Sequence, residues 1–436
     1  MKILVLSLSI IAVVMMLICI FFFPKAKLGK FSLSTFFIIP TIVAVIFLCI
    51  PKLKPALILS QFISSDGINP LEILSLFFSL IFISTILDEV GFFKVLAIYA
   101  LKKAKGKQTT LFFILTLIIA VLTVFTSNDI IIITFTPFII FFCKRANISP
   151  IPYLISEFVT ANTWSMFLLI GNPTNIYISE NFSIDFLSYL EYMALPTIFA
   201  GIAVTLMMYL LFRKKLKDDI KVEVEEETIK DKVVYYTSLS ALVITLVAMI
   251  IANFLNVPMW IVSLTSAILL LVIILFYSIR RRDSLSYLSH SLKRLPYNLI
   301  PFLLSMFVIV LALKEVDITK EMSSLLNNSQ PILTYGISSF LTANLINNIP
   351  MSILFTEIIK SSEIVKLESI YATIIGSNVC AYFTEVGALA GIMWVTLMKN
   401  NKIEFSFLSF IKYGSILSLT ALSFALIGLK ISFLIM

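Results

Sequence analysis

The 436-residue sequence is poor in charge, histidine and cysteine. Only 13% of its residues are charged, about half the share in an average soluble domain, and this excludes a water-soluble enzyme. There is one histidine, His290, and the four cysteines are widely scattered, so neither a zinc site nor a disulfide framework is indicated. A glycine-rich phosphate loop beside a lysine is also lacking. We therefore predict no enzymatic activity, no bound metal and no cofactor.

Hydrophobic residues make up 59% of the chain and gather in long runs. Several runs reach the roughly 20 residues that an α-helix needs to cross the ~30 Å of hydrocarbon in a bilayer. The net charge of +8 is typical of basic cytoplasmic loops and does not indicate nucleic acid binding. Residues 3–23 resemble a secretion signal but are too long and lack a small-residue cleavage site. We interpret them as the first transmembrane helix of an all-α polytopic membrane protein.

The apolar runs form two sets of six, in the same order, around a charged stretch. The first set lies at 3–23, 33–50, 71–87, 109–143, 151–179 and 193–212, and the second at 234–254, 258–279, 297–313, 332–359, 368–398 and 408–429. This parallel predicts an internal duplication. We expect a first transmembrane repeat at 1–212, a charged cytoplasmic linker at 213–232 and a second repeat at 233–436.

The fourth run of each set is divided by polar residues. Ser127, Asn128 and Asp129 interrupt the first, and Asn347 and Asn348 interrupt the second. Two half-depth helices joined by a polar tip form a re-entrant hairpin, which is tolerated where protein covers it or where it lines a cavity. With a hairpin that makes no net crossing, each half crosses the bilayer five times. The halves are then inverted, and about ten transmembrane helices accompany the two hairpins and two interrupted helices.

The distribution of basic residues favours this topology. With loops placed on alternate sides, 25 of the 33 Lys and Arg fall on one face and eight on the other. Because cytoplasmic loops are enriched in these residues, the first face is predicted to be cytoplasmic and both termini are predicted to lie outside. The predicted location is the cell membrane.

Polar residues inside the apolar runs are the candidate binding residues, because an unpaired polar group in hydrocarbon costs several kcal/mol. The fifth run of the first half stops at a Gly-Asn-Pro-Thr-Asn break, and that of the second half contains Gly-Ser-Asn. Both are expected to interrupt a helix, although the first could be a loop after a complete span. The predicted substrate or ion site comprises Ser127, Asn128, Asp129, Gly171, Asn172, Thr174, Asn175, Asn347, Asn348, Gly376, Ser377, Asn378 and Thr384.

Acidic residues within the membrane are natural proton or cation carriers. We predict that Asp129 and Glu385 titrate during transport, with Glu157 as the next candidate. Glu357 is a weaker candidate because Lys360, three residues on, can pair with it on one helical face. The coupling ion is expected to be a proton or sodium.

Several of these segments resemble arsenite efflux permeases, the membrane subunits of arsenical pumps within the ion transporter superfamily. The resemblance begins with Ile83 to Phe93 and continues, in order, through Ser127-Asn128-Asp129, Thr136-Pro137, Asn175-Ile176, Asn347 to Pro350, Tyr371 to Gly376, Gly387 and Trp394. It implies two inverted repeats that enclose a central site. A cytoplasmic pump ATPase is expected as a partner on the basis of this resemblance only. Where the family has an acid and then a lysine after Gly376, this chain has Asn378, Tyr382 and Thr384-Glu385.

The leading hypothesis is therefore a secondary transporter that exports arsenite or antimonite, coupled to protons. The alternative is a sodium- or proton-coupled carrier of dicarboxylates or citrate, because the first break resembles the anion-transporting relatives. A membrane-embedded enzyme or a channel is a distant third. The expected partners are the lipid bilayer and a small solute, with a homodimer as one assembly and no nucleic acid.

Overall fold

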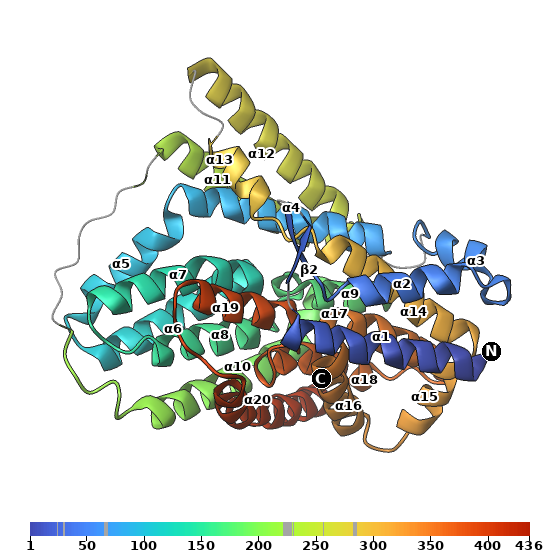
Figure 1. The fold of residues 1–436 in the computed structure, drawn as a ribbon. Coiled ribbons are helices and arrows are strands. Elements are labelled where there is room, and N and C mark those ends of the chain that lie inside the picture. The colour runs from blue at the N-terminus through green and yellow to red at the C-terminus, as the bar shows by residue number, and fades with distance from the viewer. Residues whose placement is uncertain are drawn as a thin grey trace.

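The computed structural model describes residues 1–23, 25–28, 31–64, 69–220, 229, 231–255, 257–281 and 286–436. Part of the predicted linker, residues 221–228 and 230, lies outside the described residues. The chain is almost entirely helical (Figure 1). The prediction of an all-α protein is confirmed for the described residues apart from one short antiparallel pair, β1 (Lys25–Leu28) and β2 (Phe31–Ser34), in which Leu28 lies opposite Phe31.

The elements of the two halves follow the same order. The first half contains α1 (Lys2–Phe22), α2 (Ile38–Leu48), η1 (Pro51–Leu53), α3 (Pro55–Ser60), α4 (Pro70–Glu89), α5 (Phe92–Ala104), α6 (Gln108–Phe125), α7 (Asn128–Arg145), α8 (Ile151–Trp164), η2 (Leu169–Gly171), α9 (Pro173–Asn181) and α10 (Phe186–Phe212). The second contains α11 (Lys232–Phe254), α12 (Met259–Arg281), α13 (Ser286–Lys293), α14 (Leu299–Glu315), α15 (Ile318–Leu326), α16 (Pro331–Ile346), α17 (Asn348–Lys360), α18 (Leu367–Val379), η3 (Cys380–Tyr382), α19 (Leu389–Asn400) and α20 (Phe407–Ile435). Each half therefore has a helix pair joined at a polar tip and an interrupted helix, as predicted.

Among the described residues, seven helices are long and apolar enough to span a bilayer alone. They are α1, α4, α6, α10, α11, α12 and α20. Helices α14 and α15, bent by 80°, form an eighth if they are counted together. The prediction of about ten crossings did not count α6, which was expected to be a half-depth arm of the first hairpin although it is long enough to span. It counted in addition α2, with 11 residues, and the two interrupted helices, whose separate pieces are shorter than about 20 residues.

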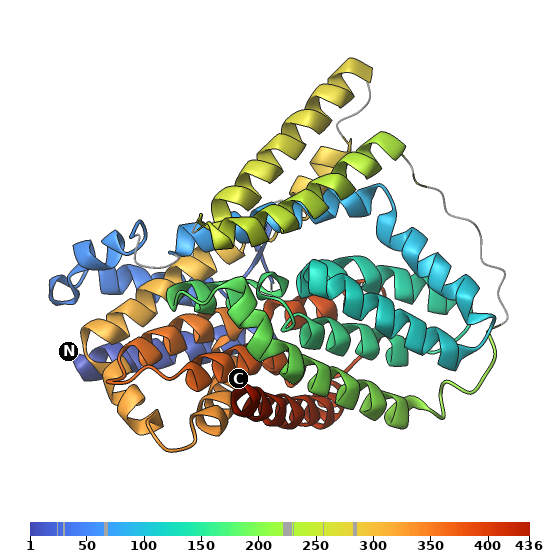
Figure 2. The same ribbon diagram turned by 180° about the vertical axis from the view of Figure 1, so that it is seen from behind.

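The two halves pack on each other reciprocally. Helix α2 contacts α14 while α12 contacts α4, and α7 contacts α19 while α17 contacts α9. Helix α10 packs along its counterpart α20. The α6–α8 group lies on one side of the molecule and the α16–α18 group on the other (Figures 1 and 2). This exchange of equivalent partners is expected of two repeats that are inverted relative to each other.

The corner after α4 matches the corner after α14 in sequence and geometry. Leu87-Asp88-Glu89-Val90-Gly91 corresponds to Leu313-Lys314-Glu315-Val316-Asp317, and the last residue of each has a positive φ, 96° for Gly91 and 60° for Asp317. In each corner the glutamate pairs with a basic residue of the other repeat: Glu89 with Arg294 at 3.0 Å and Glu315 with Lys54 at 3.1 Å. Each corner is thus linked by an ion pair to the other repeat.

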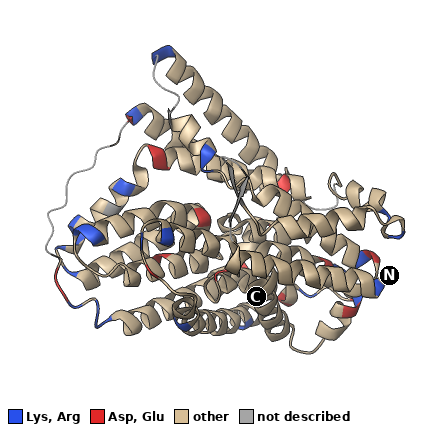
Figure 3. Cartoon of the chain, in the orientation of Figure 1, with Lys and Arg blue, Asp and Glu red and all other residues tan. Residues whose placement is uncertain are grey.

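The outer surface is apolar where lipid is expected. Large hydrophobic side chains are exposed along α11 and α12, among them Val247, Ile251, Leu269 and Phe276. Most of the helical ribbon consists of uncharged residues (Figure 3). A soluble protein rarely exposes so continuous an apolar surface, whereas a membrane-spanning one requires it.

Candidate functional site

Two polar tips meet inside the molecule. Ser127, in extended conformation, joins α6 to α7. Asn347 joins α16 to α17 with a φ of 77°, and its Oδ1 accepts a hydrogen bond from the Ile349 N–H at 3.3 Å. With a ψ of 154° the backbone of Asn347 lies in a region that residues other than glycine rarely adopt, so the second tip is a strained turn. The positive N-terminal ends of α7 and α17 therefore start within the protein interior.

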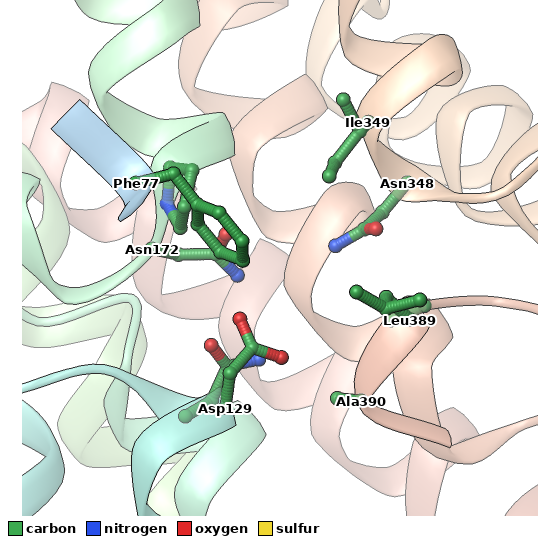
Figure 4. Close-up of a pocket in the computed structure, with 10 residues that line it drawn as sticks. Phe77, Asp129, Asn172, Asn348, Ile349, Leu389 and Ala390 are labelled. Atoms are coloured by element: carbon green, nitrogen blue, oxygen red, sulfur yellow. The ribbon is translucent and has the colours of Figure 1, made fainter. Parts of the chain in front are cut away.

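The tips form one small pocket together with α4 and the two interrupted helices (Figure 4). It is lined by Phe77, Asn128, Asp129, Asn172, Pro173, Asn348, Ile349, Ala388, Leu389 and Ala390. The Asp129 carboxylate and the Asn348 amide extend toward the pocket from opposite sides (Figure 4). The pocket is small. The space in which the centre of a water-sized sphere can lie is only about 10 Å³, which is about what one water molecule needs. In this conformation the site is closed.

A hydrogen-bond network beside the pocket joins the two repeats. Asn378, fully buried at the end of α18, accepts from Asn172 Nδ2 at 2.8 Å and from Ser165 Oγ at 2.9 Å, and donates to Asn175 Oδ1 at 2.8 Å. Thr174 Oγ1 and Ser377 Oγ lie 3.2 Å apart across the same boundary. These predicted binding residues are brought together, but their polar groups are largely occupied by one another.

The other predicted residues lie around this centre. Ser127 lines a neighbouring apolar cavity with α4. The Asn347 amide donates to the Val386 carbonyl at 3.0 Å, and Thr384 Oγ1 donates to Asn344 Oδ1 at 2.7 Å. Both contacts fasten the second hairpin to the second break, outside the pocket lining.

The predicted position of the second break was wrong. Gly376, Ser377 and Asn378 belong to the last turns of α18, and the interruption follows them, from Cys380 to Ala388. Gly376 is required instead for close helix packing, since a Cβ there would lie 2.0 Å from Ser339 Oγ on α16. The glycines that allow the chain to turn back closely in the two breaks are Gly171 and Gly387. A Cβ would lie 2.4 Å from the backbone oxygen of Ser165 at the first and 2.2 Å from the backbone oxygen of Cys380 at the second.

The four acids named from the sequence occupy different environments. Asp129 lines the pocket, and none of the described residues hydrogen-bonds or pairs with its carboxylate. Glu157 is fully buried on α8 and accepts from Thr136 Oγ1 at 2.8 and 3.0 Å. Glu385 is half-buried in the second break, outside the pocket lining. Glu357 pairs with Lys314 on α14 at 2.7 Å, a partner that a local spacing argument could not find.

Sequence reasoning missed Asn162 and Phe77. Asn162 is fully buried on α8 and accepts a hydrogen bond from Asn128 Nδ2 at 2.8 Å. A signal was present, because Asn162 precedes Gly171 by the same nine residues that separate Asn378 from Gly387. Phe77 could not be distinguished from the other apolar residues of α4.

A model of the citrate transporter family, CitMHS, matches residues 3–376. The chain belongs to this family. As a member of the citrate transporter family it is a membrane transporter, and the predicted superfamily resemblance is confirmed. The arsenical pump membrane protein of Escherichia coli K12 is 26% identical over 375 residues, covering 82% of this chain and 86% of that protein.

Further relatives extend the family comparison. The 46 kDa membrane protein of Mycobacterium leprae is 25% identical over 378 residues, covering 82% of this chain and 85% of its own. Among solved structures, Neisseria gonorrhoeae MtrF, described as one of a class of antimetabolite efflux pumps, aligns with a TM-score of 0.51 at 10% identity. The alignment covers 98% of this chain and 94% of MtrF. At that identity the comparison establishes only that this citrate transporter family member shares the fold.

Proposed function

We propose that this chain is a secondary transporter that exports arsenite or antimonite in exchange for protons. The observation that carries the proposal is the chemistry of the pocket. None of the ten described residues that line it is basic, whereas Asn128, Asp129 and Asn348 bring oxygen atoms to it. Arsenous acid, the form of arsenite at neutral pH, is small, uncharged and rich in hydroxyl donors. Such a molecule can donate hydrogen bonds to the acceptor oxygens of the pocket. The naming of the Escherichia coli relatives as arsenical pump membrane proteins adds support.

The second candidate is a proton- or sodium-coupled carrier of citrate or a dicarboxylate, favoured by the description of the family. Such a substrate brings two or three negative charges. Beside Asp129, and with no basic side chain among the described lining residues, these charges would be repelled unless cations entered with them. The lack of a basic side chain is why arsenite ranks first, whereas the positive N-terminal ends of α7 and α17 favour the second candidate.

Proton coupling is proposed to depend on the buried acids. Asp129 is the first choice because it lines the pocket directly, so its protonation and the binding of solute affect the same space. The further candidates are Glu157, which is buried on α8, and Glu385, which is half-buried in the second break. The protein is proposed to act in the cell membrane, with the basic loops in the cytoplasm and both termini outside, and without enzymatic activity or cofactor.

The test is uptake of arsenite into proteoliposomes under an imposed pH gradient. Wild-type protein should accumulate arsenite when protons can leave in exchange, and uptake should saturate. D129N should abolish accumulation while leaving the folded protein intact, and E157Q and E385Q should be measured beside it. Uptake of citrate or succinate, stimulated by sodium or protons, in place of arsenite would contradict the proposal and favour the second candidate.

A further inference from the structure

The orientation of the amide at the first hairpin tip is determined by one neighbouring side chain. Asn162 Nδ2 donates to the Phe158 carbonyl at 2.8 Å, and a carbonyl can only accept. The other atom of the Asn162 amide, Oδ1, must therefore face Asn128. It accepts from Asn128 Nδ2 at 2.8 Å.

This contact leaves the Asn128 oxygen free. Asn128 is 2% exposed, and among the described residues its Oδ1 has no hydrogen-bond partner. A buried acceptor without a donor costs about 1–3 kcal/mol, so a native protein that keeps one needs a reason. Because Asn128 lines the pocket beside Asp129, a ligand that donates a hydrogen bond supplies that reason.

The amide at the second hairpin tip is also held in one orientation, but by a backbone group. Asn348, which occupies the same place in the second hairpin, donates from Nδ2 to the backbone carbonyl of Ser377 at 3.2 Å. A backbone group therefore fixes that amide, and no substitution removes the acceptor. Asn378 is the counterpart of Asn162 in the second repeat, because each lies nine residues before the glycine of its break. The Asn378 side chain, however, bonds to Asn172 and so joins the two repeats. Only the first tip relies on a side chain for its orientation.

We propose that Asn162 is a positioning residue, which holds the Asn128 amide with its oxygen toward the pocket and so selects a hydroxyl-donating solute. This inference rests on the proposed function. Without the Asn162 acceptor, the Asn128 amide can rotate and present its NH₂ group to the pocket. A donor would then face the hydroxyl hydrogens of arsenous acid, and solute binding would weaken without any change in the transport machinery.

The experiment measures KM and maximal rate for arsenite in proteoliposomes containing wild type, N162A, N162D and N128A. N162A should raise KM about tenfold, the equivalent of one hydrogen bond, with the maximal rate within about twofold of wild type. N162D keeps an acceptor for Asn128 and should retain a KM closer to wild type than N162A does. In N162A/N128A the KM should equal that of N128A, because Asn162 acts through Asn128.

N181A is the matched control. Asn181 is also an asparagine that donates to the carbonyl four residues earlier and accepts through Oδ1, but its partner is Lys360 and it does not line the pocket. N181A should leave KM within about twofold of wild type. A fall in maximal rate alone in N162A, an unchanged KM, or additive effects of N162A and N128A would overturn the inference. If wild type itself transports neither arsenite nor antimonite, the proposed function fails first and the inference fails with it.

Discussion

Asn172 of the first repeat donates a hydrogen bond of 2.8 Å to Asn378 of the second, and both side chains are buried. Through this contact, and through Ser165 and Asn175, one side chain joins the interrupted helices of both repeats. The residues were named from the sequence as ligands. Their mutual hydrogen bonds indicate that they hold the two breaks in register beside the pocket.

N378A should therefore be strongly destabilising. It removes the acceptor of Asn172 Nδ2, the donor to Asn175 Oδ1 and one of the two acceptors near Ser165 Oγ. Hydrogen bonds inside membrane bundles contribute about 0.6 kcal/mol on average, and buried groups left unpaired cost about 1–3 kcal/mol. We expect a total loss of about 2–5 kcal/mol, measured by thermal or denaturant unfolding in detergent. N181A, at the half-buried end of α9, should cost less than about 1 kcal/mol. A stable N378A that has lost transport would instead identify Asn378 as a ligand.

The Lys314–Glu357 pair should respond asymmetrically to the loss of either partner. The side chain of Glu357 is 9% exposed and that of Lys314 is 45% exposed. K314M leaves a carboxylate buried and unpaired, which costs about 3 kcal/mol or more. E357Q leaves a lysine that can turn to water, and about 1 kcal/mol or less is expected.

Unfolding midpoints of the two single variants and of K314M/E357Q test this. The double variant should be more stable than K314M, because the second change removes the orphaned charge. K54M, which removes a 67% exposed partner of Glu315, serves as the control and should change stability little. Equal losses for K314M and E357Q would refute the explanation.

The parts of the architecture that depend on local sequence could be predicted. Polar residues within apolar runs cannot face lipid, so Ser127 to Asp129 and Asn347 to Asn348 had to be interior tips. Partners that are distant in the sequence could not be predicted in this way. Arg294 at Glu89 and Lys314 at Glu357 are separated by long stretches of chain and follow from helix packing.

The second break illustrates why composition is ambiguous. A glycine can permit an unusual backbone or a close helix contact, and the sequence does not distinguish these uses. Gly376 serves the packing of α18 on α16, whereas Gly387, eleven residues later, serves the break. The same limit applies to asparagine: Asn128 lines the pocket with a free oxygen while Asn378 is fully hydrogen-bonded.

G171A and G387A should each impair transport. The added methyl group would collide with the backbone oxygen of Ser165 or Cys380, at 2.4 and 2.2 Å, and backbone cannot move aside as a flexible side chain can. Both breaks would have to open, displacing Pro173 and Leu389, which line the pocket. We expect at least a tenfold lower rate of arsenite uptake, or about 1.4 kcal/mol in the barrier.

G91A is the matched control for these variants. Its Cβ would meet no atom within 4 Å, so only the φ of 96° opposes it. The left-handed backbone costs about 1–2 kcal/mol of stability, and transport per folded molecule should stay within about twofold of wild type. Equal transport losses in G91A and G171A would show that the close contacts in the breaks are unimportant.

The inverted topology predicts which loops can be labelled from outside the cell. Ser329 and Glu363 flank the second hairpin, and Glu404 follows the interrupted helix α18–α19; all three residues are exposed. If the hairpin enters and leaves on one side, S329C and E363C should both react with a membrane-impermeant thiol reagent in intact cells. E404C should react only after permeabilisation, because one crossing separates it from Glu363. The background should lack the native Cys19, Cys49, Cys143 and Cys380. If S329C and E363C label from opposite sides, α16 and α17 cross the membrane an odd number of times, and the hairpin assignment, with the shared pocket, is wrong.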